Sequence, residues 1–184
     1  MTPQDAVSAD VKKAVFAGGC FWCLQPAFDR VPGVAATTVG YTGGAKAFPT
    51  YEQVSSGTTG HVEAIEVQYD PGQVTYDKLL DTFWKSIDPT DADGQFVDKG
   101  AQYQTAVFYQ NDDEKRAAEK SRDKMNASGH FHAPIVTRIL PAKVFYPAEE
   151  YHQHYYLKNV LHYNTYKKGS GREGYLQRIW GGSR

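Results

Sequence analysis

The chain has 184 residues, of which 41% are hydrophobic and 22% are charged, and this predicts one globular domain over residues 1–184 and excludes a disordered chain. Its 20 Lys and Arg nearly balance its 21 Asp and Glu, so no charge excess points to a nucleic acid or an anionic membrane as a partner. No segment reaches the roughly 20 apolar residues of a membrane span, and residues 1–11 contain no apolar signal core. We therefore expect a soluble, cytoplasmic protein.

The first third of the chain alternates between strands and helices. A β-prone run at residues 12–17 meets two glycines, and residues 20–30 then favour a short helix that a Pro-Gly pair closes. The β-branched run at 34–41 predicts a strand, and a short helix is expected at 51–55 inside a loop. Residues 61–69 alternate in polarity and predict another strand.

The same alternation continues along the chain. We expect a helix over 75–87, a strand over 103–109, a charged helix over 112–127, a strand over 135–144 and a helix over 149–159. Residues 89–101 read as a polar loop, and the tail from residue 167 has little periodicity. The pattern predicts an α+β fold, a two-layer α/β sandwich with a ferredoxin-like, split β-α-β core, long loops and an irregular C-terminal tail.

The two cysteines of the chain, Cys20 and Cys23, lie where a strand ends and a helix begins. Backbone N–H groups at a helix start favour negative charge, so a cysteine there has a lowered pKa. One helical turn separates the pair, which suits a disulfide. The alternatives are a buried structural cysteine and a zinc site. Zinc would need further ligands, for which the candidates are His130, His132, His152 and His154.

Six short segments carry a more specific signal. They are GCFW at 19–22, GYTGG at 40–44, PTYEQVSSG at 49–57, TGHVEA at 59–64, DKGAQYQ at 98–104 and YPAEEYHQ at 146–153. In this order they resemble the A-type methionine sulfoxide reductases, the peptide-methionine (S)-S-oxide reductases, and the resemblance covers residues 15–156. It implies an enzyme that reduces methionine S-sulfoxide, free or in proteins, to methionine.

The resemblance also implies how the reaction starts. Cys20 would attack the sulfoxide sulfur and become a sulfenic acid. Glu63, kept protonated by burial, would donate a proton to the sulfoxide oxygen. The alternative is that Glu63 is a strand carboxylate that faces solvent.

Five further residues have implied roles around the sulfoxide. Tyr51 and Tyr103 would bind its oxygen, and Asp98 would organise this polar end. Phe21 and Trp22 would form an apolar wall for the S-methyl group. Each aromatic residue has ordinary core packing as its alternative, and Asp98 has a role as a turn or cap residue.

Recycling is implied to depend on thiols. Many members have Gly where Cys23 stands and carry cysteines in the tail, whereas residues 163–184 contain none. Cys23 is then the candidate resolving cysteine, through a Cys20–Cys23 disulfide, with direct reduction by an outside thiol as the alternative. Electrons would come from thioredoxin or another dithiol, without a bound cofactor or metal, and nothing demands more than a monomer.

Two departures from the family pattern concern the helix start and the tail. Gln25 stands where members commonly have Glu, which bears on packing and on the pKa of Cys20. The tail segment SGR at 170–172, with Trp180 and Gly181, resembles members that lack tail cysteines.

Two other classes of protein compete with the reductase. A general thiol–disulfide oxidoreductase would use Cys20 and Cys23, but it has no use for Glu63, Tyr51 and Tyr103. A metal-binding or interaction module would bind zinc without turnover. The ordered set of motifs favours the reductase over both.

Overall fold

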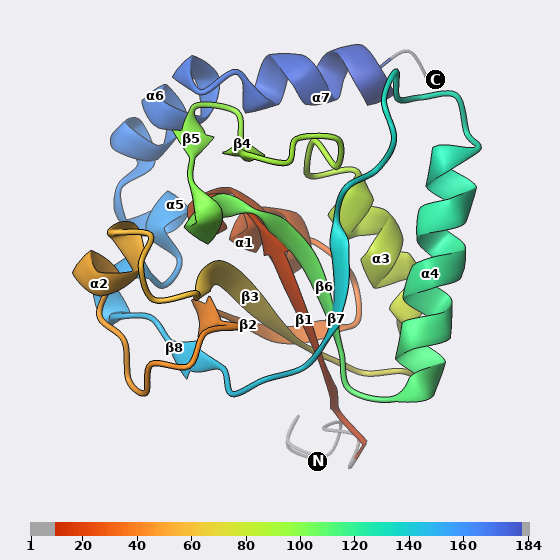
Figure 1. Cartoon of the computed structure of the whole chain (residues 1–184), viewed down its shortest axis with the longest axis horizontal. Coiled ribbons are helices and arrows are strands. Elements are labelled where there is room, and N and C mark those ends of the chain that lie inside the picture. Colours follow the sequence, from red (N-terminus) through yellow and green to blue (C-terminus); the bar gives the residue numbers. More distant parts are fainter. Residues whose placement is uncertain (1–9, 182–184) are drawn as a thin grey trace, which may run out of the picture.

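The computed structural model describes residues 10–181 and is built around a six-stranded sheet with the order β7-β6-β1-β3-β2-β8 (Figure 1). Its strands are β1 (Lys12–Gly18), β2 (Val34–Thr42), β3 (Val62–Tyr69), β6 (Thr105–Tyr109), β7 (Arg138–Pro141) and β8 (Tyr146–Pro147). β1 pairs antiparallel with β3 and β6, and β2 pairs antiparallel with β3. This order is the ferredoxin-like arrangement, so the predicted α+β class is confirmed.

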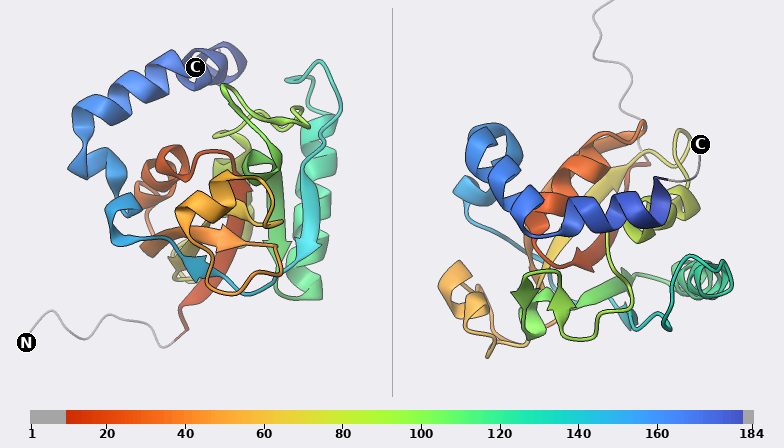
Figure 2. Two further views of the ribbon diagram at one scale, coloured as in Figure 1. Left: turned by 60° about the vertical axis from the view of Figure 1, so that its left-hand side comes forward. Right: turned by 90° about the horizontal axis from the view of Figure 1, so that it is seen from above.

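The long helices in the first two thirds of the chain pack on the sheet, whereas the C-terminal helices lie beyond one end of it (Figure 2). They are α1 (Phe21–Asp29), α2 (Tyr51–Ser55), α3 (Tyr76–Trp84), α4 (Asp112–Asn126), α5 (Tyr155–Lys158), α6 (Val160–Gly169) and α7 (Arg172–Trp180). Two 3-10 turns, η1 (Ala101–Tyr103) and η2 (Glu150–His152), and a hairpin of β4 (Gly94–Gln95) and β5 (Asp98–Lys99) complete the described chain. In Figure 1, α7 passes above this hairpin.

The core lies on both faces of the sheet because side chains of β1 alternate. Ala14 and Phe16 join the main cluster under the helices, whereas Val15 and Ala17 join a smaller cluster on the other face. The ring of Phe16 stacks on Phe28 of α1, with ring centroids 5.3 Å apart. Burying one such side chain stabilises the fold by about 1.5–3 kcal/mol, so this stack fixes α1, and with it the segment before α1, on the sheet.

The expectation of an irregular tail from residue 167 is wrong. The chain forms α6 and α7 there. In α7 only Arg172 is buried, so this helix has no apolar face that the sequence could reveal. Arg172 donates hydrogen bonds to the carbonyl oxygens of Ser86 and Gly18. Long-range polar contacts therefore fix this end of the chain, and such contacts leave no hydrophobic period in the sequence.

Two other predicted elements are shorter in the structure. The strand expected over 135–144 is confined to β7, and the helix expected over 149–159 is split into η2 and α5. The split lies at His154, which has φ +51°. Just before it, the Gln153 amide bonds to both backbone groups of Val39 in β2, so this segment is held to the sheet edge and does not continue as a helix.

Gly19 is a tight position whose replacement tests the packing before α1. It has φ +78°, and a Cβ there would lie 2.5 Å from the Cβ of Gln95. We expect Gly19→Ala to lower the free energy of unfolding by about 2–4 kcal/mol, from backbone strain and overpacking together. Gly129 has φ +79° with open space around it, so Gly129→Ala should cost only about 1–2 kcal/mol. Equal losses in urea unfolding would show that the Gln95 contact is unimportant.

Candidate active site

Strand pairing brings distant segments to the end of β1. Gly18, the last residue of β1, pairs with Thr105 at the start of β6, and η1 ends at Tyr103 just before it. On the other side β3, which begins at Val62, runs antiparallel to β1. Cys20, Glu63 and Tyr103 therefore come from three segments that meet at one end of the sheet.

Glu63 lies beside Cys20 at the start of α1. Cys20 is the N-cap residue of that helix, and the backbone N–H of Phe21 donates to Oε1 of Glu63 at 3.1 Å. Glu63 is 3% exposed, so it is not a strand carboxylate facing solvent. Burial raises the pKa of Glu63 to about 8; the hydrogen bond from Phe21 opposes this shift, and the charge of Asp98 adds to it. Glu63 therefore carries a proton at neutral pH.

The two cysteines are free thiols and form one buried pair. Burial, and the hydrogen bond with the Cys23 thiol, raise the pKa of Cys20 well above its ordinary value. That bond lowers the pKa of Cys23 to about 7. The expected lowering of the Cys20 pKa at the helix start is thus wrong, because desolvation outweighs the helix terminus. Within the pair, Cys23 is therefore the thiol that ionises more readily.

The polar end of the site contains the two predicted tyrosines and Asp98. Burial raises the pKa of Tyr51, and the charges of Glu63 and Cys20 add to this effect. The pKa of Tyr103 is raised by burial and then by Glu63 and Tyr51. Asp98, half-buried in β5, accepts a hydrogen bond from the Tyr166 hydroxyl. Both phenols therefore keep their protons at neutral pH and can donate hydrogen bonds.

The two predicted wall residues differ in their surroundings. Phe21 is 1% exposed and belongs to the main core. Trp22 is half-buried, stacks on Tyr155 at a centroid distance of 3.9 Å, and donates from Nε1 to Nδ1 of His152 at 3.0 Å. Trp22 is therefore the more accessible of the two apolar side chains.

Sequence reasoning missed two residues that reach the site from the tail. Tyr166 of α6 bonds to Asp98 and meets the Trp22 ring edge-on at 5.9 Å. Arg172 of α7 bonds to the carbonyl oxygen of Gly18, two residues before Cys20. A usable signal for the first was the pair Tyr163 and Tyr166, whose spacing of three residues is that of one helix face.

The departure at Gln25 has a structural reason. The side chain is fully buried; its Nε2 donates to Oγ1 of Thr37 at 3.1 Å, and its Oε1 accepts from the backbone N–H of His154 at 2.7 Å. A carboxylate lacks the donor that the first bond needs. Gln25 therefore links α1 to β2 and to the segment before α5.

Three of the four histidines considered as zinc ligands have other contacts. His152 packs between Phe21 and Tyr51, His154 lies 3.5 Å from a carboxylate oxygen of Asp29, and His130 packs on Trp180. Across residues 10–181 no group of three or more His, Cys, Asp and Glu side chains is arranged to hold a metal ion. In the same part of the chain, no helix has the length and apolar character to cross a membrane.

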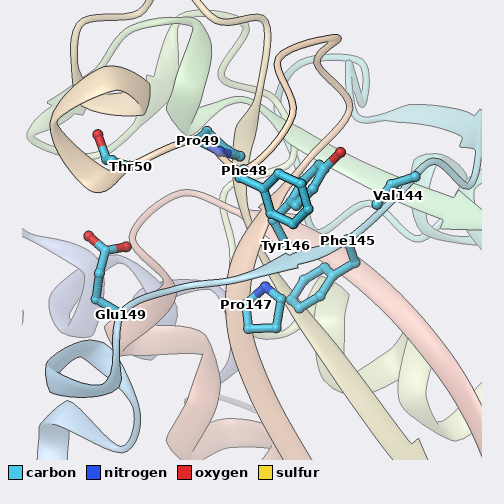
Figure 3. A pocket seen from close by; sticks show the side chains of 8 residues that line it. All are labelled: Phe48, Pro49, Thr50, Val144, Phe145, Tyr146, Pro147 and Glu149. Carbon is cyan, nitrogen blue, oxygen red and sulfur yellow. The ribbon is translucent and has the colours of Figure 1, made fainter.

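A separate apolar groove lies beside the edge strand β8 (Figure 3). Its volume is about 480 Å³, and its lining residues are Phe48, Pro49, Thr50, Val144, Phe145, Tyr146, Pro147 and Glu149. Glu149 links the groove to the site, because its carboxylate accepts from the Tyr51 backbone N–H at 3.1 Å and from the Tyr41 hydroxyl at 3.0 Å. Neither thiol lines this groove.

Known proteins resemble the chain over most of its length. The family model described as peptide methionine sulfoxide reductase matches residues 12–184. Peptide methionine sulfoxide reductase MsrA of Bacillus licheniformis is 54% identical over 91% of this chain and 93% of its own. Mxr1 from Saccharomyces cerevisiae in reduced form is 32% identical, with a TM-score of 0.78 over 83% of this chain and 87% of that one. Mxr1 in complex with Trx2, at 23% identity and a TM-score of 0.55 over 82% and 91%, shares the fold.

Proposed function

Because the chain belongs to the peptide methionine sulfoxide reductase family and reduces methionine sulfoxide, we propose that Cys20 and Glu63 perform the chemistry. The observation that carries this proposal is the protonated, buried Glu63 at the helix start that Cys20 caps. A sulfoxide becomes a good electrophile once its oxygen is protonated or hydrogen-bonded. An acid with a pKa near 8 keeps that proton at neutral pH and can still release it.

The first half of the reaction consumes the sulfoxide. The Cys20 proton passes to the Cys23 thiolate within the pair, and the Cys20 thiolate attacks sulfur. Glu63 gives its proton to the sulfoxide oxygen as the S–O bond to methionine breaks and the oxygen moves to Cys20. The products are methionine, a sulfenic acid on Cys20 and a Glu63 carboxylate.

The other site residues bind the substrate in this proposal. Tyr51 and Tyr103 donate hydrogen bonds to the sulfoxide oxygen, and Asp98 holds the polar end in place. Phe21 and Trp22 form the apolar wall against the S-methyl group. Cys20 is 6% exposed, so the substrate must displace side chains around it. One such side chain is Tyr166, whose hydroxyl donates a hydrogen bond to Asp98 before the substrate binds.

Recycling is proposed to run through Cys23 and an external dithiol. A thiol attacks the sulfenic sulfur, water leaves, and a Cys20–Cys23 disulfide remains. Thioredoxin or another dithiol then reduces this disulfide, and the Mxr1 complex with Trx2 supports such a donor in the family. Oxidised proteins and free methionine sulfoxide are the proposed substrates. The cytoplasmic location, the monomeric state and the lack of a nucleic-acid partner stay predictions of the sequence.

The decisive test is turnover of each methionine sulfoxide epimer with dithiothreitol as the reductant. We expect reduction of the S epimer alone. If the folded, reduced protein leaves both epimers unchanged but reduces protein disulfides, the thiol–disulfide oxidoreductase becomes the better description.

Cys23→Ser tests the resolving role. After one equivalent of sulfoxide without reductant, wild type should lose both free thiols to an internal disulfide, whereas the variant should stop at the sulfenic acid. Methionine should still form in the first turnover, because loss of the neighbouring thiolate makes Cys20 easier to ionise. Mass spectrometry with a sulfenic-acid trap measures both species. A wild-type enzyme that accumulates sulfenic acid and never the disulfide would assign resolution to an outside thiol.

A further inference from the structure

Arg172 is a buried cation close to the thiol pair. It is 3% exposed, and its Nη1 and Nη2 donate to the carbonyl oxygens of Ser86 at 2.8 Å and Gly18 at 3.1 Å. Its guanidinium lies 4.7 Å from the centroid of the Phe96 ring. Over residues 10–181 it forms no ion pair with a carboxylate. A charge buried without a partner is costly, so a nearby anion would stabilise it.

The guanidinium lies against the backbone that leads into Cys20. Gly18, which accepts one of its hydrogen bonds, ends β1. A Cβ on Gly19 would lie 3.1 Å from Nη2 of Arg172. A side chain at residue 19 would therefore crowd Arg172, and the positive charge lies within one or two residues of Cys20 along the backbone. Cys23 stands one helical turn further on, with its backbone N–H donating to the carbonyl oxygen of Cys20 at 3.1 Å.

We propose that Arg172 is a positioning residue for recycling, whose guanidinium is the counter-charge of the Cys23 thiolate. This proposal rests on the reductase function and on Cys23 as the resolving cysteine. In the resolving step Cys23 first releases to solvent the proton that it took from Cys20. Its thiolate then attacks the sulfenic sulfur of Cys20, an S–S bond forms, and the S–O bond breaks. The leaving oxygen takes a proton from solvent and departs as water. A fixed positive charge beside Cys23 raises the thiolate fraction that starts this step.

Some of the groups around Cys23 lower the pKa of its thiol, and others raise it. The hydrogen bond from Cys20 is the main cause that lowers the pKa of Cys23, and burial opposes it. The charges of Arg172 and then Lys167 lower this pKa further, whereas the charge of Asp98 raises it. Glu63 is neutral at neutral pH. The phenols of Tyr163 and Tyr166 also face the pair, and their raised pKa values keep them neutral.

Arg172 is the better anchored of the two cations. Lys167 is only half-buried on α6, so water and salt screen its charge. Arg172 is buried and held by two hydrogen bonds, so its charge acts at a fixed place in a medium that screens little. Removing Arg172 should therefore affect Cys23 more than removing an exposed cation of α7 such as Arg178.

The test titrates the Cys23 thiol directly. A Cys20→Ser background leaves one cysteine in the chain, and its ultraviolet thiolate absorbance is followed against pH. Adding Arg172→Gln should raise the midpoint by about one pH unit, which lowers the thiolate fraction at pH 7 about fivefold when the midpoint starts near 7. Arg172→Lys keeps the charge and should shift it less. Arg178→Gln, on the exposed face of the same helix, should leave it unchanged.

This titration needs no substrate, so it stands apart from the test of the reductase function. A midpoint that Arg172→Gln leaves in place would overturn the proposal. If circular dichroism shows that this variant does not fold, Arg172→Met in the same Cys20→Ser background decides, since it keeps the aliphatic stem and removes the charge: a raised midpoint supports the proposal, and an unchanged one overturns it.

The rate of disulfide formation gives a second test of the role of Arg172. With Cys20 present, Arg172→Gln should slow formation of the Cys20–Cys23 disulfide about fivefold at pH 7 after one equivalent of sulfoxide, in line with the lost thiolate. Methionine is measured in the same samples. No methionine would count against the reductase function, whereas normal methionine with an unchanged disulfide rate would count against Arg172.

Discussion

Cys20→Ser is expected to lower the rate of methionine sulfoxide reduction by at least about 10³-fold. A serine hydroxyl ionises far less readily than a thiol and cannot form a sulfenic acid or a disulfide. The change replaces one atom at the start of α1 and leaves the core stack beneath that helix intact. Loss of activity should therefore come without loss of fold, which methionine formation and thermal unfolding of the same sample would show.

The matched control is Cys23→Ser, the same substitution one helical turn away. Its first turnover should remain, because the sulfur that attacks is that of Cys20, and without the neighbouring thiolate Cys20 can lose its proton to solvent more easily. The comparison matters because the resting pair has its lowered pKa on Cys23. If Cys20→Ser still converts one equivalent of sulfoxide and Cys23→Ser does not, the two roles are reversed.

The sheet could be predicted from the sequence because its side chains alternate. In β1, Ala14 and Phe16 face the helices while Val15 and Ala17 face the other way, and this period of two is visible in the chain itself. Helix α3 was likewise visible from Leu79, Leu80, Phe83 and Trp84, all buried in the structure. Local patterning therefore predicted the ferredoxin-like core.

The electrostatics of the thiols could not be predicted in the same way. The sequence indicates that Cys20 starts a helix, and this alone lowers a thiol pKa. It does not show that Cys20 is 6% exposed or that its thiol bonds to Cys23. Depth of burial and the partner's charge are tertiary properties, and here they decide the sign of the shift.

The tail was missed for a related reason. Tyr166 and Arg172 are fixed by single polar contacts with Asp98, Gly18 and Ser86, which are far away in the sequence. A helix held by such bonds needs no apolar stripe, so the hydrophobic periodicity of the sequence does not reveal it. The SGR segment at 170–172 was nevertheless a signal of a buried arginine, because the small residues Ser170 and Gly171 leave room for the Arg172 side chain to turn inward.

Glu63→Gln is expected to slow the sulfoxide-consuming step by about 10²- to 10⁴-fold, the usual contribution of a general acid. Glutamine has the same shape and can still accept the hydrogen bond that the Phe21 N–H donates to Glu63. It cannot release a proton to the sulfoxide oxygen. The fold should therefore persist while the single-turnover rate of methionine formation falls. Glu66→Gln on the same strand, where Glu66 pairs with Lys13 at 3.3 Å, should leave that rate unchanged.

The pH profile separates the acid from a merely structural carboxyl. Glu63 acts in its protonated form, so the wild-type rate should fall as pH rises through about 8. The thiol pair acts after losing a proton, so the rate should also fall as pH drops through about 7. Glu63→Gln should lose the alkaline limb and keep the acidic one, because only the thiols still titrate. An alkaline limb that survives in this variant would assign it to another group and remove Glu63 from the role of proton donor.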